Sequence, residues 1–274
     1  MKCAWEDLLG ILPPQIRGEV DKRGKGTLQE LRLRLGQQPR MICSSGPYSL
    51  NGAVREEDLR YVINMACRYS PWSAETVAKG YITASGGHRI GLCGVGVVSD
   101  GQVRGIRDVT SLNIRVARDF PGIAGRITGR ENILILGPPG GGKTTLLRDV
   151  ARELARQQQV SVVDERGELF PEGFCRGGHM DVLTFCPKSE GIDMVLRTMG
   201  PNWIAVDEIT SEEDCRALIR TGWCGVGLVA TAHAADRQDL LRRKVYRPLV
   251  DTGLFSQLMI LCADKTWRWE RMAT

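Results

Sequence analysis

The glycine-rich segment at residues 137–144 limits the possible folds more than any other part of this sequence. It reads Gly-Pro-Pro-Gly-Gly-Gly-Lys-Thr and matches G-x-x-x-x-G-K-[ST] at every required position. An apolar run at 133–136 leads directly into it, and the spacing of apolar residues predicts a helix over 144–157. In such a setting the N–H groups of the loop and of the helix start surround a phosphate group. The sequence therefore predicts a phosphate-binding loop within an α/β fold.

Each residue type in this loop has an expected task, and together they predict ATP and Mg²⁺ as the cofactors. Lys143 should reach the β- and γ-phosphates, and the hydroxyl of Thr144 should coordinate Mg²⁺. Thr145 is placed to assist at the α-phosphate. The residues expected to contact the nucleotide are Gly137, Pro138, Pro139, Gly140, Gly141, Gly142, Lys143, Thr144 and Thr145.

Polar residues follow two further apolar runs. Asp207 and Glu208 come directly after the run at 203–206, and ligands of open α/β folds bind where the carboxyl ends of parallel strands meet. We predict that Asp207 holds Mg²⁺ through water and that Glu208 polarises the attacking water. The alternative is an acidic cap on the helix that follows. His233 comes after another run, where an imidazole can donate to the γ-phosphate; a purely structural histidine is the alternative.

Three carboxylates also follow the apolar run at 160–163. They belong to Asp164, Glu165 and Glu168, and near a triphosphate they would repel it unless a metal or water network intervened. This pattern favours a catalytic role for at least one of them, with a solvated acidic loop as the alternative. Glu208 is the first choice for orienting water and Glu168 the second.

The two halves of the chain have different patterns. Residues 1–120 predict a small α+β domain, residues 121–274 predict a three-layer α/β domain, and Phe120-Pro121-Gly122 is typical of a linker. In the first domain the predicted strands are 30–35, 41–43, 91–98 and 112–116, and the predicted helix is 59–67. In the second domain the predicted strands are 133–136, 160–163, 182–185, 203–206 and 228–230, and the predicted helices are 144–157, 192–199, 212–220 and 237–245.

Composition excludes several classes of protein. The 274 residues are 42% hydrophobic and contain no apolar run near the 18 residues of a membrane span, and acidic residues at positions 6 and 7 argue against a signal peptide. The 37 basic and 32 acidic residues are interspersed and leave a net charge of +5, which argues against a nucleic-acid-binding tail. The nine scattered cysteines fit a reducing cytoplasm.

The order of these segments resembles that of the secretion ATPases of type II and type IV systems. In that family residues 137–144 correspond to the Walker A loop, 164–168 to the Asp box, 207–208 to Walker B and 231–233 to the His box. The resemblance implies a RecA-like P-loop ATPase domain preceded by a small N-terminal domain that contributes assembly contacts and the edge of the nucleotide site.

Further phrases resemble the branch of this family that acts during endospore formation. They stand at residues 30–34, 86–91, 111–117, 163–168, 186–191 and 205–209, so the resemblance covers nearly the whole chain.

The resemblance implies an ATP hydrolase that works as a ring-shaped homo-oligomer, expected to be a hexamer. It would power a secretion-like channel from the cytoplasmic face of the mother-cell membrane, docked to integral membrane proteins and without direct contact to nucleic acid. Its catalytic residues would be Glu208, Glu168, Lys143 and His233. An arginine acting in trans is expected among Arg89, Arg104, Arg107 and Arg115.

Two other functions fit the same residues. The first is a P-loop ATPase coupled to nucleic acid, although the R-x-x-x-H pattern of nucleic-acid-binding relatives is absent from the sequence. The second is a scaffold that binds ATP without hydrolysing it, which the acidic pair Asp207-Glu208 argues against.

Overall fold

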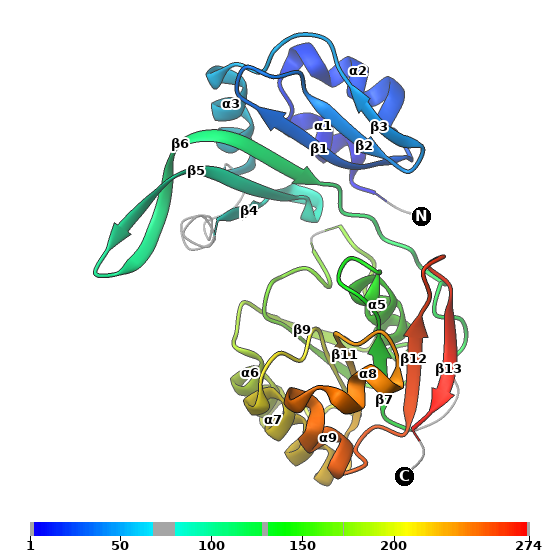
Figure 1. The fold of residues 1–274 in the computed structure, drawn as a ribbon. Coiled ribbons are helices and arrows are strands. Elements are labelled where there is room, and N and C mark those ends of the chain that lie inside the picture. The colour runs from blue at the N-terminus through cyan, green and yellow to red at the C-terminus, as the bar shows by residue number, and fades with distance from the viewer. Residues whose placement is uncertain (1–2, 68–79, 128–130, 172, 273–274) are drawn as a thin grey trace. The chain divides into compact units, whose positions relative to one another are not determined.

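The computed structural model of the chain describes residues 3–67, 80–127, 131–171 and 173–272. The chain divides into two compact units (Figure 1). Unit 1 comprises Met1–Asp119 with Pro171–Phe174, and unit 2 comprises Phe120–Phe170 with Cys175–Thr274. Within the described residues, no helix is long and apolar enough to cross a membrane.

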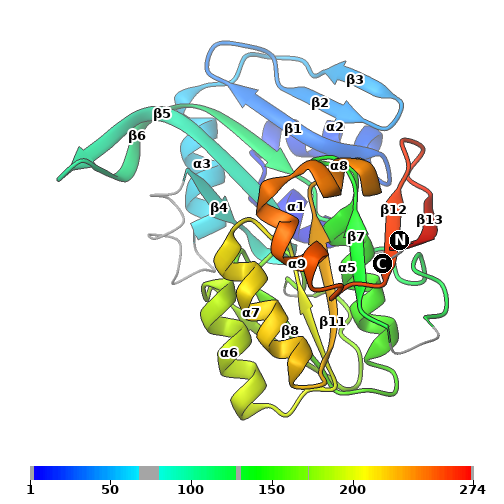
Figure 2. The ribbon, with the colours of Figure 1, turned by 60° about the horizontal axis from the view of Figure 1, so that its bottom comes forward.

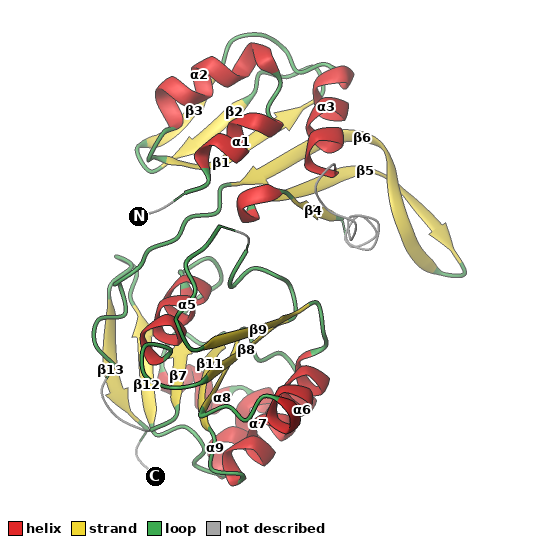
Figure 3. Cartoon of the chain, turned by 180° about the vertical axis from the view of Figure 1, so that it is seen from behind, coloured by secondary structure: helices red, strands yellow, loops and turns green. Residues whose placement is uncertain are grey.

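Unit 1 is an antiparallel sheet with helices on one face (Figure 3). The strand order is β3-β2-β1-β6-β5-β4, and every neighbouring pair is antiparallel. The helices are α1 (Trp5–Ile11), α2 (Pro14–Gly24) and α3 (Glu56–Cys67), with a 3₁₀ turn at Ser85–Gly87. The strands are β1 (Leu28–Arg34), β2 (Arg40–Cys43), β3 (Gly46–Ser49), β4 (Tyr81–Thr83), β5 (Arg89–Ser99) and β6 (Gln102–Arg115).

The core of unit 1 follows from its sequence periodicity. Alternate residues of β1 are buried, with Leu31 and Leu33 at most 1% exposed, as the period-two pattern predicts. Leu59, Val62 and Ala66 of α3 form the buried stripe that their spacing predicts. The structure adds α1, α2 and β3, which the sequence analysis did not predict.

The predicted strands near 91–98 and 112–116 are parts of one long hairpin. Strands β5 and β6 pair from Arg89↔Arg115 to Ser99↔Gln102, with bulges between Cys93 and Val95 and between Val97 and Val98. The far end of the β5–β6 hairpin projects beyond the rest of the unit 1 sheet (Figure 1).

Unit 2 is a largely parallel sheet with helices on both faces. The strand order is β13-β12-β7-β11-β10-β8-β9. Among the described strands of this sheet, β13 pairs antiparallel with β12, and all other neighbouring pairs are parallel. Its strands are β7 (Ile133–Leu136), β8 (Val160–Asp164), β9 (Met180–Thr184), β10 (Trp203–Val206), β11 (Gly227–Ala232), β12 (Gln257–Leu261) and β13 (Trp267–Arg271). Its helices are α5 (Lys143–Leu154), α6 (Lys188–Thr198), α7 (Glu212–Trp223), α8 (Arg237–Arg242) and α9 (Arg247–Asp251), with a 3₁₀ turn at Lys244–Tyr246.

Buried strand residues of unit 2 point alternately to two cores. Leu134 and Leu136 of β7 pack with residues of α6 to α9, whereas Ile133 and Ile135 pack with α5. Helices α6 and α7 lie side by side (Figure 2). The continuous apolar strands are therefore buried on both faces, which confirms the predicted three-layer arrangement.

Some element boundaries differ from the prediction. The predicted helix 237–245 ends at Arg242, because Arg243 is extended, with φ −85° and ψ 113°. Helix α9 then begins at Arg247, with Pro248 as its second residue. The predicted strand 182–185 occupies 180–184 instead, since Phe185 has a positive φ of 58° that ends the extended backbone. Strands β12 and β13 were not predicted.

Candidate functional site

The glycine-rich loop joins β7 to the start of α5, as the sequence predicts. Gly140 and Gly142 have positive φ angles of 72° and 106°, a region that side chains other than glycine rarely adopt. Gly142 is the residue immediately before α5, and Lys143 begins the helix. The loop therefore ends at a helix N-terminus, where the free N–H groups and the helix dipole favour an anion.

Lys143 is buried within this loop, with an exposed fraction of only 6%. Its Nζ donates to the carbonyl oxygens of Gly137 (2.9 Å) and Pro138 (3.0 Å), and to Nδ1 of His233 (3.0 Å). Burial lowers the pKa of Lys143, while the carboxylates of Asp207 and Glu208 oppose that shift. The lysine thus joins the loop after β7 to the loop after β11.

Thr144 and Asp207, the two residues predicted to hold Mg²⁺, are in contact in the structure. The Thr144 hydroxyl donates to Oδ2 of Asp207 at 2.7 Å, and the Thr231 hydroxyl donates to Oδ1 at 2.7 Å. A hydroxyl and a carboxylate are hard oxygen ligands of the kind Mg²⁺ takes beside phosphate and water oxygens. The donor set fits Mg²⁺ bound together with a nucleotide.

The carboxylate of Glu208 contacts two side chains from neighbouring loops, the imidazole of His233 and the guanidinium of Arg166. Because the ammonium of Lys143 can only donate to Nδ1 of His233, Nε2 carries the ring proton and donates to Oε1 of Glu208 at 2.5 Å. Nη1 of Arg166 lies 2.6 Å from Oε2. Burial alone would raise the pKa of Glu208, but the hydrogen bond from His233 and the charge of Arg166 outweigh it and lower that pKa.

The backbone at Glu208 is unusual and is stabilised by a side chain. Its φ is 56°, in the left-handed region where a residue with a side chain is uncommon. Its N–H donates to Oγ1 of Thr231 at 2.7 Å. Thr231 therefore supports both members of the acidic pair, since its hydroxyl also donates to Asp207.

The acidic segment after β8 forms a tight loop around a buried carboxylate. Asp164 accepts hydrogen bonds from the N–H groups of Glu168 (3.0 Å) and Leu169 (2.8 Å). Burial raises the pKa of Asp164 to about 6, and the charge of Asp207 adds to that shift. The carbonyl of Glu168 accepts a hydrogen bond from Arg148 at 2.8 Å. Asp164 therefore organises this loop.

The structure thus brings together Lys143, Thr144, Asp207, Glu208 and His233 in one connected network, and it places Glu168 in the loop that supplies Arg166. Thr145 is the third residue of α5.

Two basic residues near the site were not predicted, and four predicted arginines lie in the other unit. Arg166 and the buried Lys188 were not predicted as site residues. The sequence signal for Arg166 is its position within the acidic segment 164–168, and that for Lys188 is its position within 186–191, one of the segments that resemble the family. The four arginines considered for a role in trans lie on β5 and β6 of unit 1.

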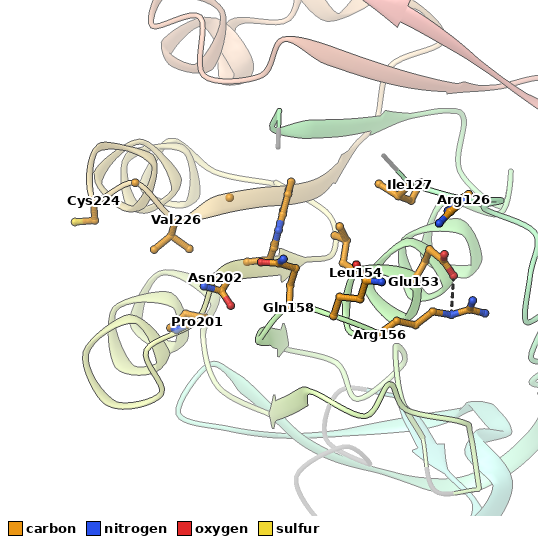
Figure 4. A pocket seen from close by; sticks show the side chains of 14 residues that line it. Arg126, Ile127, Glu153, Leu154, Arg156, Gln158, Pro201, Asn202, Cys224 and Val226 are labelled. Atoms are coloured by element: carbon orange, nitrogen blue, oxygen red, sulfur yellow. Dashed lines mark ion pairs between the residues drawn. The ribbon is translucent and has the colours of Figure 1, made fainter. Parts of the chain in front are cut away.

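A separate cavity of about 870 Å³ opens at the amino ends of the unit 2 strands (Figure 4). Its lining includes the carboxyl end of α5 and the first residues of β10 and β11, Trp203 and Gly227. There Arg156 and Glu153 form an ion pair of 2.9 Å. This cavity lies at the amino ends of the strands, whereas residues 137–144 follow a carboxyl end, so it is distinct from the site above.

The fold and the loop define a P-loop ATPase fold like that of the ATPase DotB and the pilus retraction motor PilT. The X-ray structure of the Legionella pneumophila ATPase DotB matches 94% of this chain and 79% of its own, at 17% identity and a TM-score of 0.58. The pilus retraction motor PilT with bound ADP matches 93% of this chain and 82% of its own, at 12% identity and a TM-score of 0.64. The predicted RecA-like α/β fold is confirmed.

The sequence comparisons identify the branch. The family model described as "Sporulation stage III, protein AA" matches residues 5–268. Stage III sporulation protein AA of Bacillus subtilis (strain 168) is 34% identical over 282 aligned residues, which cover 94% of this chain and 91% of that protein. The chain belongs to the sporulation stage III protein AA family.

Proposed function

We propose that this protein hydrolyses ATP at the site formed by residues 137–144 and the ends of β10 and β11. The observation that carries the proposal is the unbroken chain of contacts from Lys143 through His233 to Glu208, alongside the contact of Thr144 with Asp207. Side chains from three neighbouring strand ends meet at the carboxyl edge of a parallel sheet, where open α/β folds bind ligands.

The roles follow from the chemistry of each group. The loop amides and Lys143 hold the β- and γ-phosphates, and Thr144 and Asp207 hold Mg²⁺, which neutralises phosphate charge when bound. Glu208 is ionised at neutral pH, because its pKa lies below the usual range, and it orients water toward the γ-phosphate. His233 reports the state of the phosphate through Lys143. Glu168 is the second choice for orienting water.

The wider role rests on the family and on the fold shared with secretion motors. In this proposal the protein forms a ring-shaped homo-oligomer, a hexamer, on the cytoplasmic face of the mother-cell membrane. It drives a secretion-like assembly during endospore formation, docked to integral membrane proteins. Nucleic acid is not among its direct partners.

Nucleotide binding and phosphate release, measured together on the full chain, test the activity. Wild type should bind ATP and release phosphate in the presence of Mg²⁺. Lys143→Ala should lose binding, whereas Glu208→Gln should keep binding and lose release. Glu212→Gln is a matched control, because Glu212 lies on the exposed surface of α7 and pairs with Arg216.

Two results would redirect the proposal. Intact ATP binding with no release in wild type, even at concentrations that assemble the oligomer, would identify a scaffold. Release that depends on added DNA or RNA and falls steeply with salt would identify a nucleic-acid-coupled ATPase.

A further inference from the structure

The carboxylate of Glu208 has partners on both of its oxygens. His233 donates to Oε1 at 2.5 Å, and Arg166 contacts Oε2 at 2.6 Å. A carboxylate offers about four lone-pair sites, so two donors fix the plane of the group while leaving sites open for water. His233 comes from the loop after β11 and Arg166 from the loop after β8, and the strands β8 and β11 flank β10, which carries Glu208.

The loop that carries Arg166 is held in place on both sides. On one side, Asp164 accepts the N–H groups of Glu168 and Leu169, which closes the loop. On the other, Glu165 is 2.5 Å from Nζ of Lys188, whose side chain is 5% exposed. The start of the Arg166 side chain is therefore set by buried groups and not by solvent.

Lys188 also connects this loop to the turn after Glu208. Its Nζ lies 3.9 Å from Oδ2 of Asp214. That same oxygen accepts from the N–H groups of Thr210 (2.9 Å) and Ser211 (3.1 Å). The backbone on either side of the Arg166–Glu208 contact is thus fixed by one buried cation and its two carboxylate partners.

We infer that Arg166 is a positioning residue for Glu208, acting within the same chain. Together with His233 it holds the carboxylate in the orientation in which the free lone pairs face the water that attacks the γ-phosphate. This inference rests on the proposed ATP hydrolysis and names a residue for which that proposal has no role.

The contact is suited to orientation more than to stability. The side chain of Arg166 is 48% exposed and that of Glu208 is 23% exposed, and ion pairs with such exposure contribute little to folding free energy. Displacement of a reacting group by about 1 Å can cost about 100-fold in rate. Loss of Arg166 should therefore reduce turnover without unfolding the protein.

The test compares Arg166→Ala, Arg166→Lys and wild type in the full chain. Arg166→Ala should lower kcat by about 10- to 100-fold, with an unchanged Kd for a non-hydrolysable ATP analogue and an unchanged Tm. Arg166→Lys keeps a cation within reach of Oε2 and should recover part of the lost rate. Arg220→Ala is the matched control, because Arg220 is 51% exposed and pairs with Asp193 at 3.1 Å; its kcat should equal that of wild type.

A second variant separates orientation of Glu208 from a general structural effect. In a Glu208→Asp background, which keeps a carboxylate with a measurable rate but draws it back from Arg166, Arg166→Ala should cause little further loss of rate, because the group it positions is already displaced. Additive losses, or an Arg166→Ala protein as fast as or faster than wild type, would overturn the inference. If Arg166→Ala lowers Tm, Arg166→Gln takes its place with the same expected results. Absence of hydrolysis by wild type would instead refute the proposed function.

Discussion

Replacement of Thr231 by valine removes the hydroxyl that supports the acidic pair while keeping the shape of the side chain. Thr231 is fully buried. Its hydroxyl donates to Oδ1 of Asp207 at 2.7 Å and accepts from the N–H of Glu208 at 2.7 Å. The variant leaves the Glu208 N–H without this acceptor and Asp207 without this donor.

The magnitude follows from the two lost contacts. A hydrogen bond to a charged group contributes about 1.5–3 kcal/mol, and a buried donor left without a partner costs about 1–3 kcal/mol. The two terms share one hydroxyl, and the Glu208 N–H is only partly buried. We therefore expect Thr231→Val to lower the free energy of unfolding by about 2–4 kcal/mol.

The assay is urea unfolding followed by the intrinsic fluorescence of the tryptophans, with Thr221→Val as the control. Thr221 is equally buried, but its hydroxyl only donates to the carbonyl of Ala217 at 2.9 Å within α7. The control should change stability by less than about 1 kcal/mol, and Thr231→Ser should restore most of the loss. Equal changes for Thr231→Val and Thr221→Val would refute the reasoning.

Three further predictions concern pH, the loop and the histidine. Asp164 has a pKa of about 6 in the fold, above its ordinary 3.8, so its protonation favours the folded state. Its contribution to stability should increase by about 3 kcal/mol as the pH falls from above 6 to below 4, measured as the difference between wild type and Asp164→Asn in urea unfolding at each pH. Gly142→Ala forces a side chain into a positive φ of 106° and should weaken ADP binding in calorimetry, because strain of about 1–2 kcal/mol falls on the loop; Gly253→Ala, also at positive φ but in another loop, should leave ADP binding unchanged. His233→Ala removes the side chain that links Lys143 to Glu208 and should lower kcat more than it changes the affinity for ADP.

Each of these predictions has a contrary result. Equal pH dependence of wild type and Asp164→Asn would show that Asp164 is not the titrating group. Unchanged ADP binding by Gly142→Ala would show that the left-handed backbone at this position is not required. A His233→Ala protein with wild-type kcat would remove His233 from the catalytic network.

The sequence was sufficient for the parts of the fold that local patterns encode. Strands 133–136 and 203–206 have the same bounds in the structure, because each is a short apolar run bounded by polar residues or glycine. The loop between β7 and α5 was predictable because its residues and spacing are fixed by the task of surrounding a phosphate. Strand β12 was missed, since a short apolar segment does not by itself distinguish a helix from a strand. Helix α1 and strand β13 were missed because each is short and mixes charged with apolar residues.

The sequence was insufficient where contacts depend on the pairing of distant strands. Arg166 and Glu208 are 42 positions apart, and they meet because β8 and β10 pair in register, with Val163 opposite Val206. Lys188 likewise contacts Glu165 and Asp214 only after α6, α7 and β8 have packed. Sequence spacing carries no signal for such contacts, so the partners of the acidic residues became apparent only in the fold.

Single-turnover phosphate release from ATP labelled at the γ-phosphate tests the central claim most directly. With the full chain in excess over ATP, wild type should release labelled phosphate only when Mg²⁺ is present, and Glu208→Gln should bind the same ATP and retain the label. Equal release by wild type and Glu208→Gln, or release by wild type that does not depend on Mg²⁺, would contradict the account.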